Sequence, residues 1–208
     1  MPDGTTAYEG EYQNGKRDGF GVYYFKTGKL CYVGGWKENK RQGTGISFRP
    51  SDGAIHVGRW EENAPAGMGS RFDSQGNLLF AGSWSDGQRQ GPGVSYQSQS
   101  GRIFVGQWKN DSLCEKGTEF DNQGNLLYSG GWQDGARNGF GTQYDASGDI
   151  VYRGEWRSGR YDGEGTLHLD NGNTVRGHFT AGAVCGQAVE WGYTGCKVYD
   201  GQWKDGVY

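Results

Sequence analysis

The sequence predicts an all-β protein, an elongated repeat array of antiparallel β-hairpins that form a curled, twisted single sheet. Two observations predict this class. Glycine and aromatic residues recur at a spacing of 24 residues along almost the whole chain. Apolar residues alternate with a period of two around each repeated turn, as strands require, and no segment has the periodicity of a helix.

The composition excludes several classes of protein. Of 208 residues 41 are Gly, but only 4 are Pro and no Gly-X-Y period exists, which excludes collagen. Aromatic residues reach 14% and the net charge is -3, unlike a disordered chain. No apolar run approaches the ~20 residues of a membrane helix, and no signal peptide is visible, so we expect no transmembrane segment and a cytoplasmic location. The slightly negative charge argues against nucleic acid as a partner.

The repeat is centred on a glycine that most often follows Tyr-x or Phe-x, and we number this glycine position 0. It recurs in steps of 24 residues, with one step of 23, at Gly10, Gly34, Gly58, Gly82, Gly106, Gly130, Gly154, Gly177 and Gly201. Position −2 is mostly aromatic, +2 is mostly Trp, +5 is always Gly, Asn or Asp, and +9 and +11 are mostly Gly. We therefore divide 1–208, as a single array, into about nine repeats: 1–30, 31–54, 55–78, 79–102, 103–126, 127–150, 151–173, 174–197 and a truncated 198–208.

Each repeat is expected to contain a strand, a two-residue turn at +4 and +5, a second strand, and a second turn after the aromatic residue at +14. Gly, Asn and Asp tolerate the positive φ that such tight hairpin turns need. With this turn, +3 pairs with +6, +2 with +7, 0 with +9 and −2 with +11, which places Tyr128 opposite Gly141. Four arginines at +7 then face +2 aromatics and either stack on them or stay solvated: Arg17, Arg41, Arg89 and Arg137.

The pattern Y-x-G-x-W-x-x-G-x-x-x-G-x-G, as in Tyr128 to Gly141, is similar to the MORN (membrane occupation and recognition nexus) repeat. The resemblance runs from Tyr8 to Tyr208, with departures at Glu115, in the turn at 63–66, and in the eighth repeat. It implies a scaffold, or a module attached to other domains, in cytoskeletal, ciliary or membrane-apposed assemblies. The same resemblance implies an association with phospholipids.

The sequence has no catalytic motif, so we expect a non-catalytic protein without a cofactor or a metal. The four cysteines show no C-x-x-C spacing, which favours buried free thiols in a reducing compartment. His56 and His168 are interpreted as rings that replace Tyr or Phe. The predicted function is binding of a helical or extended segment of a partner protein along an aromatic groove. The groove residues are Tyr32, Trp36, Phe80, Trp84, Phe104, Trp108, Tyr128, Trp132, Tyr152 and Trp156.

Two further interactions are expected from the sequence. The ninth repeat ends after its turn, which predicts a homodimer through an unpaired C-terminal edge that carries Tyr199, Trp203 and Tyr208. The alternative function is a phosphoinositide-binding peripheral membrane module, for which 153–160 supplies the densest basic run. Its lipid-binding residues are Arg153, Arg157 and Arg160, although acidic residues flank them.

Overall fold

A computed structural model describes residues 7–208, and within this range it contains 17 strands and no helix. All 17 strands belong to one antiparallel sheet, which confirms the predicted all-β class. The chain separates into two compact units. Unit 1 takes the residues up to Ser100 together with Trp108–Asp111, and unit 2 takes Gly101–Gln107 and Ser112–Tyr208.

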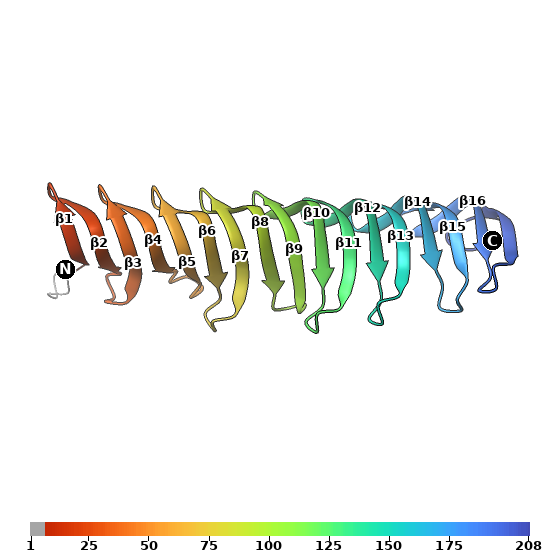
Figure 1. The fold of residues 1–208 in the computed structure, drawn as a ribbon, viewed down its shortest axis with the longest axis horizontal. Helices are drawn as coiled ribbons and strands as arrows, with labels where there is room; N and C mark the ends of the chain where they lie inside the picture. The colour runs from red at the N-terminus through yellow and green to blue at the C-terminus, as the bar shows by residue number, and fades with distance from the viewer. Residues whose placement is uncertain (1–6) are drawn as a thin grey trace. The chain divides into compact units, whose positions relative to one another are not determined.

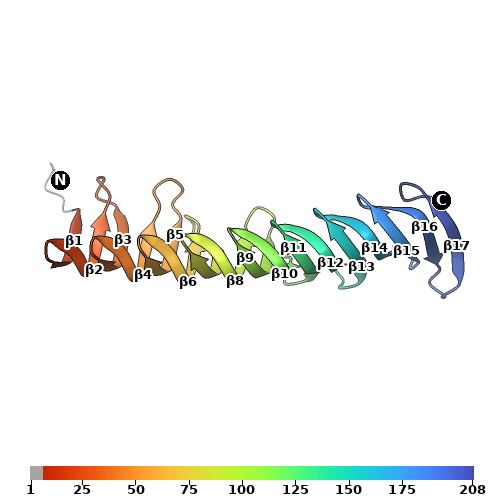
Figure 2. The same cartoon turned by 90° about the horizontal axis from the view of Figure 1, so that it is seen from above.

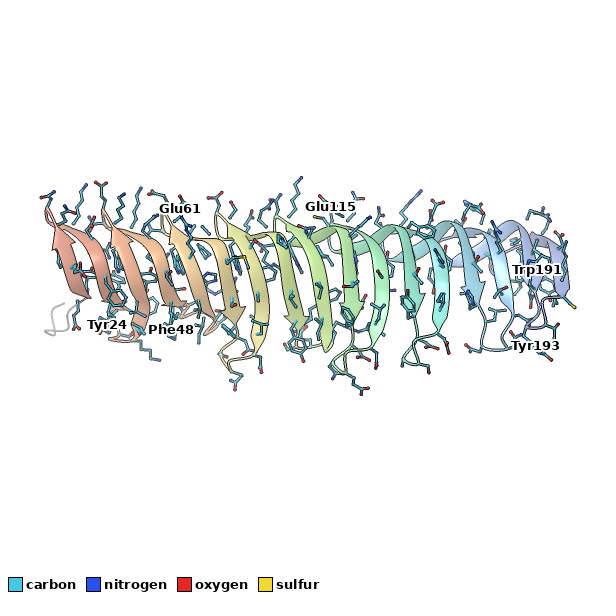
Figure 3. All side chains as sticks on the ribbon, viewed as in Figure 1. Tyr24, Phe48, Glu61, Glu115, Trp191 and Tyr193 are labelled. Atoms are coloured by element: carbon cyan, nitrogen blue, oxygen red, sulfur yellow. The ribbon has the colours of Figure 1, made fainter. Side chains whose placement is uncertain are left out.

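Unit 1 contains four successive hairpins, which lie side by side in chain order (Figure 1). Their strands are β1 (Tyr8–Gln13), β2 (Lys16–Tyr24), β3 (Leu30–Lys37), β4 (Lys40–Phe48), β5 (Ile55–Glu61), β6 (Ala64–Phe72), β7 (Leu78–Ser85) and β8 (Gln88–Gln97). The two-residue turns lie along one edge of unit 1 and the longer second turns along the other. Figure 3 shows Glu61 at the first of these edges, with Tyr24 and Phe48 near the second.

Unit 2 continues the same alternation of short and longer turns (Figure 2). Strand β9 (Arg102–Lys109) contributes residues to both units. The strands that follow are β10 (Ser112–Phe120), β11 (Leu126–Gln133), β12 (Ala136–Tyr144), β13 (Ile150–Arg157), β14 (Arg160–His168), β15 (Thr174–Thr180), β16 (Ala183–Trp191) and β17 (Lys197–Trp203).

The tight turns have the geometry that the sequence predicts. Both central residues take a positive φ, for example 52° at Asn14 and 74° at Gly15, and 51° at Asp134 and 79° at Gly135. A turn with two such residues matches the right-handed twist of the strands that it joins, and Asn, Asp and Gly adopt these angles at the lowest cost. The +4 and +5 columns therefore fix where each hairpin reverses.

The strand register differs from the prediction beyond the residues next to the turn. Trp132 pairs with Arg137, as expected, but Gly130 pairs with Gly141 and Tyr128 with Gln143. The same shift of two residues occurs in other hairpins, because a bulge follows position +7 on the second strand. The glycine at +9 lies in this bulge; in the hairpin that contains Tyr128 it is Gly139, with a φ of 79°. The predicted pairings of 0 with +9 and of −2 with +11 are therefore wrong.

The core of each unit consists of aromatic rings that lie flat over backbone. The ring of Tyr128 covers Gly130 and Gly141, and a Cβ built on Gly141 would lie only 2.2 Å from the Tyr128 hydroxyl. That hydroxyl donates a hydrogen bond to the carbonyl oxygen of Gly131 at 3.0 Å. The predicted contact of Tyr128 with Gly141 is present, but it runs diagonally between strands. Glycine is needed at positions 0 and +11 because the ring occupies the space of a side chain.

The tryptophan at +2 joins each hairpin to the one before it. The Trp36 indole Nε1 donates to the carbonyl oxygen of Gly21 at 3.2 Å, and Trp156 donates to that of Gly141 at 3.2 Å. The indoles from Trp36 to Trp156 also meet the −2 ring of the preceding repeat edge to face, as Trp60 does with Tyr32 at a centroid distance of 5.4 Å. The aromatic columns thus form the core within each unit, on the surface of the sheet that we call the core face.

Candidate functional site

The residues predicted to line a partner-binding groove are mostly core residues. Tyr32, Tyr128 and Tyr152 have no exposed surface, and six of the other predicted groove residues are also buried. Phe104 is half-buried. Burial raises the pKa of Tyr32 and that of Tyr128 to about 12. A partner cannot contact these rings without displacing the core, so the structure corrects the position of the predicted groove.

The arginines at +7 stack on tryptophan, but on a different tryptophan from the one predicted. Arg17 pairs across the hairpin with Tyr12, yet its guanidinium lies 4.2 Å from the ring centroid of Trp36 in the following repeat. It also donates to the Asn39 backbone oxygen at 3.0 Å. Arg41 stacks on Trp60 in the same way, at 4.3 Å. The arginine column therefore holds successive repeats together and belongs to the core face.

Unit 2 varies this arrangement. In the repeat that follows Arg137, position +5 is Gly159, which has no side chain to accept a hydrogen bond from the arginine. Arg137 instead forms an ion pair with the buried carboxylate of Glu119 at 2.8 Å, and Arg102 forms a second one at 2.7 Å. In the next repeat Tyr161 takes the +7 position and stacks on Tyr152 at 3.8 Å. Arg137 keeps a more distant contact with the next tryptophan, at 5.1 Å from the Trp156 ring centroid, and the ion pairs add to it, whereas at Tyr161 ring stacking replaces the arginine.

The opposite surface of the sheet in unit 1, the outer face, is exposed and mostly apolar. Strand residues alternate between faces, so a residue beside a core-face glycine points to the outer face. Val22 pairs with Val33, and Ile46 pairs with Val57 across this face. Phe20 and Met68 are 57% and 66% exposed. The apolar outer face comprises Phe20, Val22, Val33, Ile46, Val57, Met68, Ala81 and Val94.

A pocket interrupts the core face of unit 1 at the third repeat. It has a volume of about 350 Å³ and is lined by His56, Trp60, Trp84 and three arginines, among other residues. The arginines are Arg41, Arg49 and Arg71. His56 is only 6% exposed, and neither of its ring nitrogens has a hydrogen-bond partner within the described residues. Burial first, and then the charges of Arg71 and Arg41, lower the pKa of His56 to about 4.

The sequence prediction treated His56 as a ring in a structural column, which its edge-to-face contacts with Trp60 and Trp84 fit. The sequence prediction did not anticipate that His56 also lines a pocket together with three arginines. A signal was present, because one repeat departs from the pattern at several columns together. His56 replaces Tyr or Phe at −2, Pro65 replaces Arg at +7, and Arg71 stands at +13.

The structure only partly gathers the residues predicted for lipid binding. Arg153 is exposed on the outer face of unit 2, where its guanidinium lies 5.9 Å from the Phe140 ring centroid. Arg157 and Arg160 pair across the next tight turn. Arg157 forms an ion pair with Asp162 at 3.3 Å. One of the three charges is thus already balanced.

The residues predicted for self-association contact one another. Tyr208 stacks on Tyr199 at a centroid distance of 4.0 Å and meets Trp203 edge to face at 4.6 Å. This arrangement repeats that of Tyr161 with Tyr152, because Tyr208 also stands at +7. Trp203 is buried, while Tyr208 stays 62% exposed.

The remaining features considered in the sequence are the cysteines, metal-binding groups and membrane-spanning helices. The four cysteines form no disulfide, but they are not buried: Cys196 is exposed and the other three are half-buried. Within residues 7–208 there is no group of three or more His, Cys, Asp and Glu side chains suited to a metal. The part of the chain that the structure describes has no helix long and apolar enough to span a membrane.

The family model of the MORN repeat matches more than half of the chain. The matched residues are 8–29, 32–53, 80–101, 104–125, 128–150, 152–174 and 199–208. The chain belongs to the MORN repeat family, whose members typically take part in protein or membrane interactions. The matched segments leave out the third and the eighth repeat, although the hairpins β5–β6 and β15–β16 form there.

No curated protein matches the sequence. Among solved structures, the chain is similar to a protein of unknown function from Bacteroides caccae. The two are 14% identical over 92% of this chain and 77% of the other, and the TM-score is 0.20. This likeness is too low to carry an argument about structure or function.

Proposed function

We propose that this protein is a non-catalytic scaffold that binds an amphipathic helix of a partner protein on the apolar outer face of unit 1. The observation that carries the proposal is the row of apolar side chains on that face, of which three are exposed and five are half-buried. Large apolar patches on a soluble protein commonly mark interaction surfaces. Phe20, Val57 and Met68 are the most exposed members of the row, and the valines and Ile46 between them form a continuous floor.

The backbone pairing favours a helix over an extended segment. Each strand from β2 to β7 has a hydrogen-bonded neighbour on both sides. Strand addition requires free backbone groups at a sheet edge, and these strands offer none. An amphipathic helix instead buries side chains and needs no backbone partner. The partner thus meets the face with an apolar stripe.

The charges on the outer face indicate which side chains flank the apolar stripe of the partner helix. Arg59 points to the outer face, where it pairs with Thr44, and it has no hydrogen bond or ion pair within the described residues. Glu9 and Glu11 also lie on this face, on β1. A helix that places one acidic residue beside Arg59, away from these carboxylates, therefore complements this surface. A cytoskeletal or membrane-apposed assembly is the setting that we propose for such a scaffold.

Selection of displayed amphipathic helical peptides against the purified chain tests this proposal. Peptides selected on the unmodified chain should lose binding by about tenfold or more on Met68→Glu, because the substitution buries a charge under the apolar stripe. Gln75→Glu, in the exposed second turn of the same repeat, is the matched control and should bind as before. Selected peptides that bind both variants alike would contradict the proposed site.

The alternative function, binding of phosphoinositides in a membrane through Arg153, Arg157 and Arg160, has less support. Asp162 pairs with Arg157, and Glu155 lies on the same strand as Arg153. Co-sedimentation with phosphoinositide vesicles at increasing salt tests it. Binding that falls steeply with salt, and that is lost in Arg153→Gln, would favour the membrane over a protein partner.

A further inference from the structure

The pocket in the third repeat exists because two side chains are smaller than their counterparts. In five repeats a tyrosine at −2 reaches across the glycines and donates to the +1 carbonyl of its own strand. One example is Tyr32, with an Oη–oxygen distance of 3.1 Å to Gly35. The shorter ring of His56 makes no such bond. In other repeats an arginine at +7 covers the next tryptophan, but here Pro65 stands at +7, and Trp84 lines the pocket instead.

The pocket is also strongly cationic. Arg41, Arg49 and Arg71 line it, and no Asp or Glu is among the described residues that do so. Arg49 is balanced by Asp52, with which it forms a close ion pair in the adjacent turn. Arg71 has no hydrogen bond or ion pair within the described residues, and Arg41 donates only to Asn63. Asp52 and Asp111 lie near enough to raise the pKa of Arg71, but neither forms an ion pair with it, and the cleft that holds the two guanidinium groups has no carboxylate among the described residues of its lining.

Burial disfavours the charged forms of these groups. It lowers the pKa of Arg71, and the neighbouring charge of Arg49 lowers it further, while Asp52 and Asp111 offset part of this shift. Burial also lowers the pKa of Arg41. His56 adds two unpartnered ring nitrogens, one of which carries a proton in the neutral ring. Buried polar groups are normally paired, so this set of donors lacks an acceptor.

We propose that the His56 pocket binds a phosphate monoester dianion, held by Arg71 and Arg41 and contacted by the His56 ring. Arginine presents a planar fork of donors that matches phosphate oxygens, and such charge-assisted hydrogen bonds are the strongest of their kind. A dianion balances both unpaired guanidinium groups, which a single carboxylate does not. The volume of about 350 Å³ falls in the range of small-molecule sites and leaves room for the organic part of the ester.

The site is independent of the proposed partner helix. His56 and Arg71 face the core face, whereas Met68 faces the outer face of the same hairpin. Of the proposed ligands, His56 and Arg71 lie in a repeat that the family model does not match, whereas Arg41 lies in the matched segment 32–53 and belongs to the +7 arginine column. Phosphate binding should therefore persist in Met68→Glu.

Calorimetric titration of the full chain with inorganic phosphate and with glycerol phosphate tests the proposal. We expect binding to weaken by about tenfold or more in Arg71→Gln, which removes one guanidinium. His56→Tyr should abolish binding, because it restores the ring that fills this space in other repeats. Lys37→Gln, which removes an exposed positive charge outside the pocket, is the matched control and should leave the affinity unchanged.

Two further measurements separate loss of binding from loss of folding, and a lipid ligand from a soluble one. Thermal unfolding should show that His56→Tyr remains folded, and the NMR titration of the His56 ring should shift to higher pH when phosphate is present. Phosphatidylcholine vesicles with and without phosphatidic acid separate a lipid-borne from a soluble ligand: Arg71-dependent binding to the phosphatidic acid vesicles alone assigns the phosphate to a lipid. The proposal is overturned if no phosphate compound binds, or if Arg71→Gln and Lys37→Gln bind alike.

Discussion

The −2 side chain shows how one residue sets the local chemistry of a repeat. Tyrosine at this position has both a ring that covers the paired glycines and a hydroxyl that reaches a backbone carbonyl, as in Tyr152 with Glu155 at 3.0 Å. Phe80 keeps the ring and omits the hydroxyl. His56 keeps a smaller ring with two polar atoms that its surroundings do not satisfy. The same column thus contains a structural residue in most repeats and a candidate ligand-binding residue in one.

The buried imidazole makes stability depend on pH. The pKa of His56 is lowered from 6.5 to about 4 in the folded chain. Above pH 6.5 the ring is neutral in both states, whereas between 6.5 and 4 only the unfolded state takes up the proton. The free energy of unfolding should therefore fall by roughly 3 kcal/mol as the pH drops through this window.

Urea denaturation of the unmodified chain and of His56→Phe, at pH 7.5 and at pH 4.5, measures this dependence. The variant lacks the titrating ring, so the difference between the two proteins isolates the contribution of His56 from that of the carboxylates. Equal pH dependence in both proteins would show that the ring accepts a proton in the folded state.

One tryptophan differs from the others at the level of a single atom. Trp156 Nε1 donates to the Gly141 carbonyl, but the buried Nε1 of Trp132 has no partner within the described residues. Phenylalanine removes the N–H and little of the ring. We expect Trp156→Phe to lower the free energy of unfolding by about 1 kcal/mol more than Trp132→Phe, as measured by chemical denaturation. Equal losses would mean that water or a shifted ring satisfies Trp132.

The hairpin is the element in which glycine becomes obligatory. The close approach of Gly130 to Gly141, and the ring of Tyr128 over both, leave no volume for a side chain. Gly141→Val should cost about 1–3 kcal/mol or more, because the ring must move or the strands must separate. Thermal unfolding measures the loss. Gly192→Ala is the control, since its new Cβ would have no neighbour closer than 3.4 Å and should change little.

Contacts between hairpins depend on the arginine at +7. Arg17 stacks on Trp36, and its Nε donates to Asn39 Oδ1 at 3.4 Å, both in the next hairpin. Arg17→Ala should therefore lower the free energy of unfolding by about 1 kcal/mol. A double-mutant cycle with Asn39→Gly should show coupling of the same sign, while Lys37→Ala with Asn39→Gly serves as the uncoupled control. Additive effects for the first pair would show that arginine and asparagine act separately.

At the scale of the whole molecule, self-association through Tyr199, Trp203 and Tyr208 stays a prediction. The exposed ring of Tyr208 and the exposed Val198 and Val207 give this part of unit 2 an apolar surface. We expect a dimer at micromolar concentration, measured by light scattering after size exclusion, and a monomer for Val207→Asp with Tyr208→Ser. A monomeric unmodified chain would contradict the prediction. A dimeric variant would show that the dimer contact lies on another surface.

The sequence by itself determined the repeat, the class of fold and the position of every tight turn. Local chemistry is enough for these features: Asn14-Gly15 and Asp134-Gly135 favour positive φ wherever they stand, and period-two alternation specifies strands. The function of each column was less predictable. The sequence placed Trp36 and Tyr32 in a groove because aromatic residues suit binding, while the structure places them in the core.

Only the tertiary structure decided the register, the partner of each arginine and the contents of the pocket. The bulge at Gly139 shifts the pairing by two residues, and no local pattern marks a bulge apart from an ordinary strand glycine. Arg17 meets Trp36 because the next hairpin packs beside it, 19 residues away in sequence. His56 and Arg71 likewise converge from different strands. These contacts depend on how strands pack in space, which the one-dimensional spacing of residues does not contain.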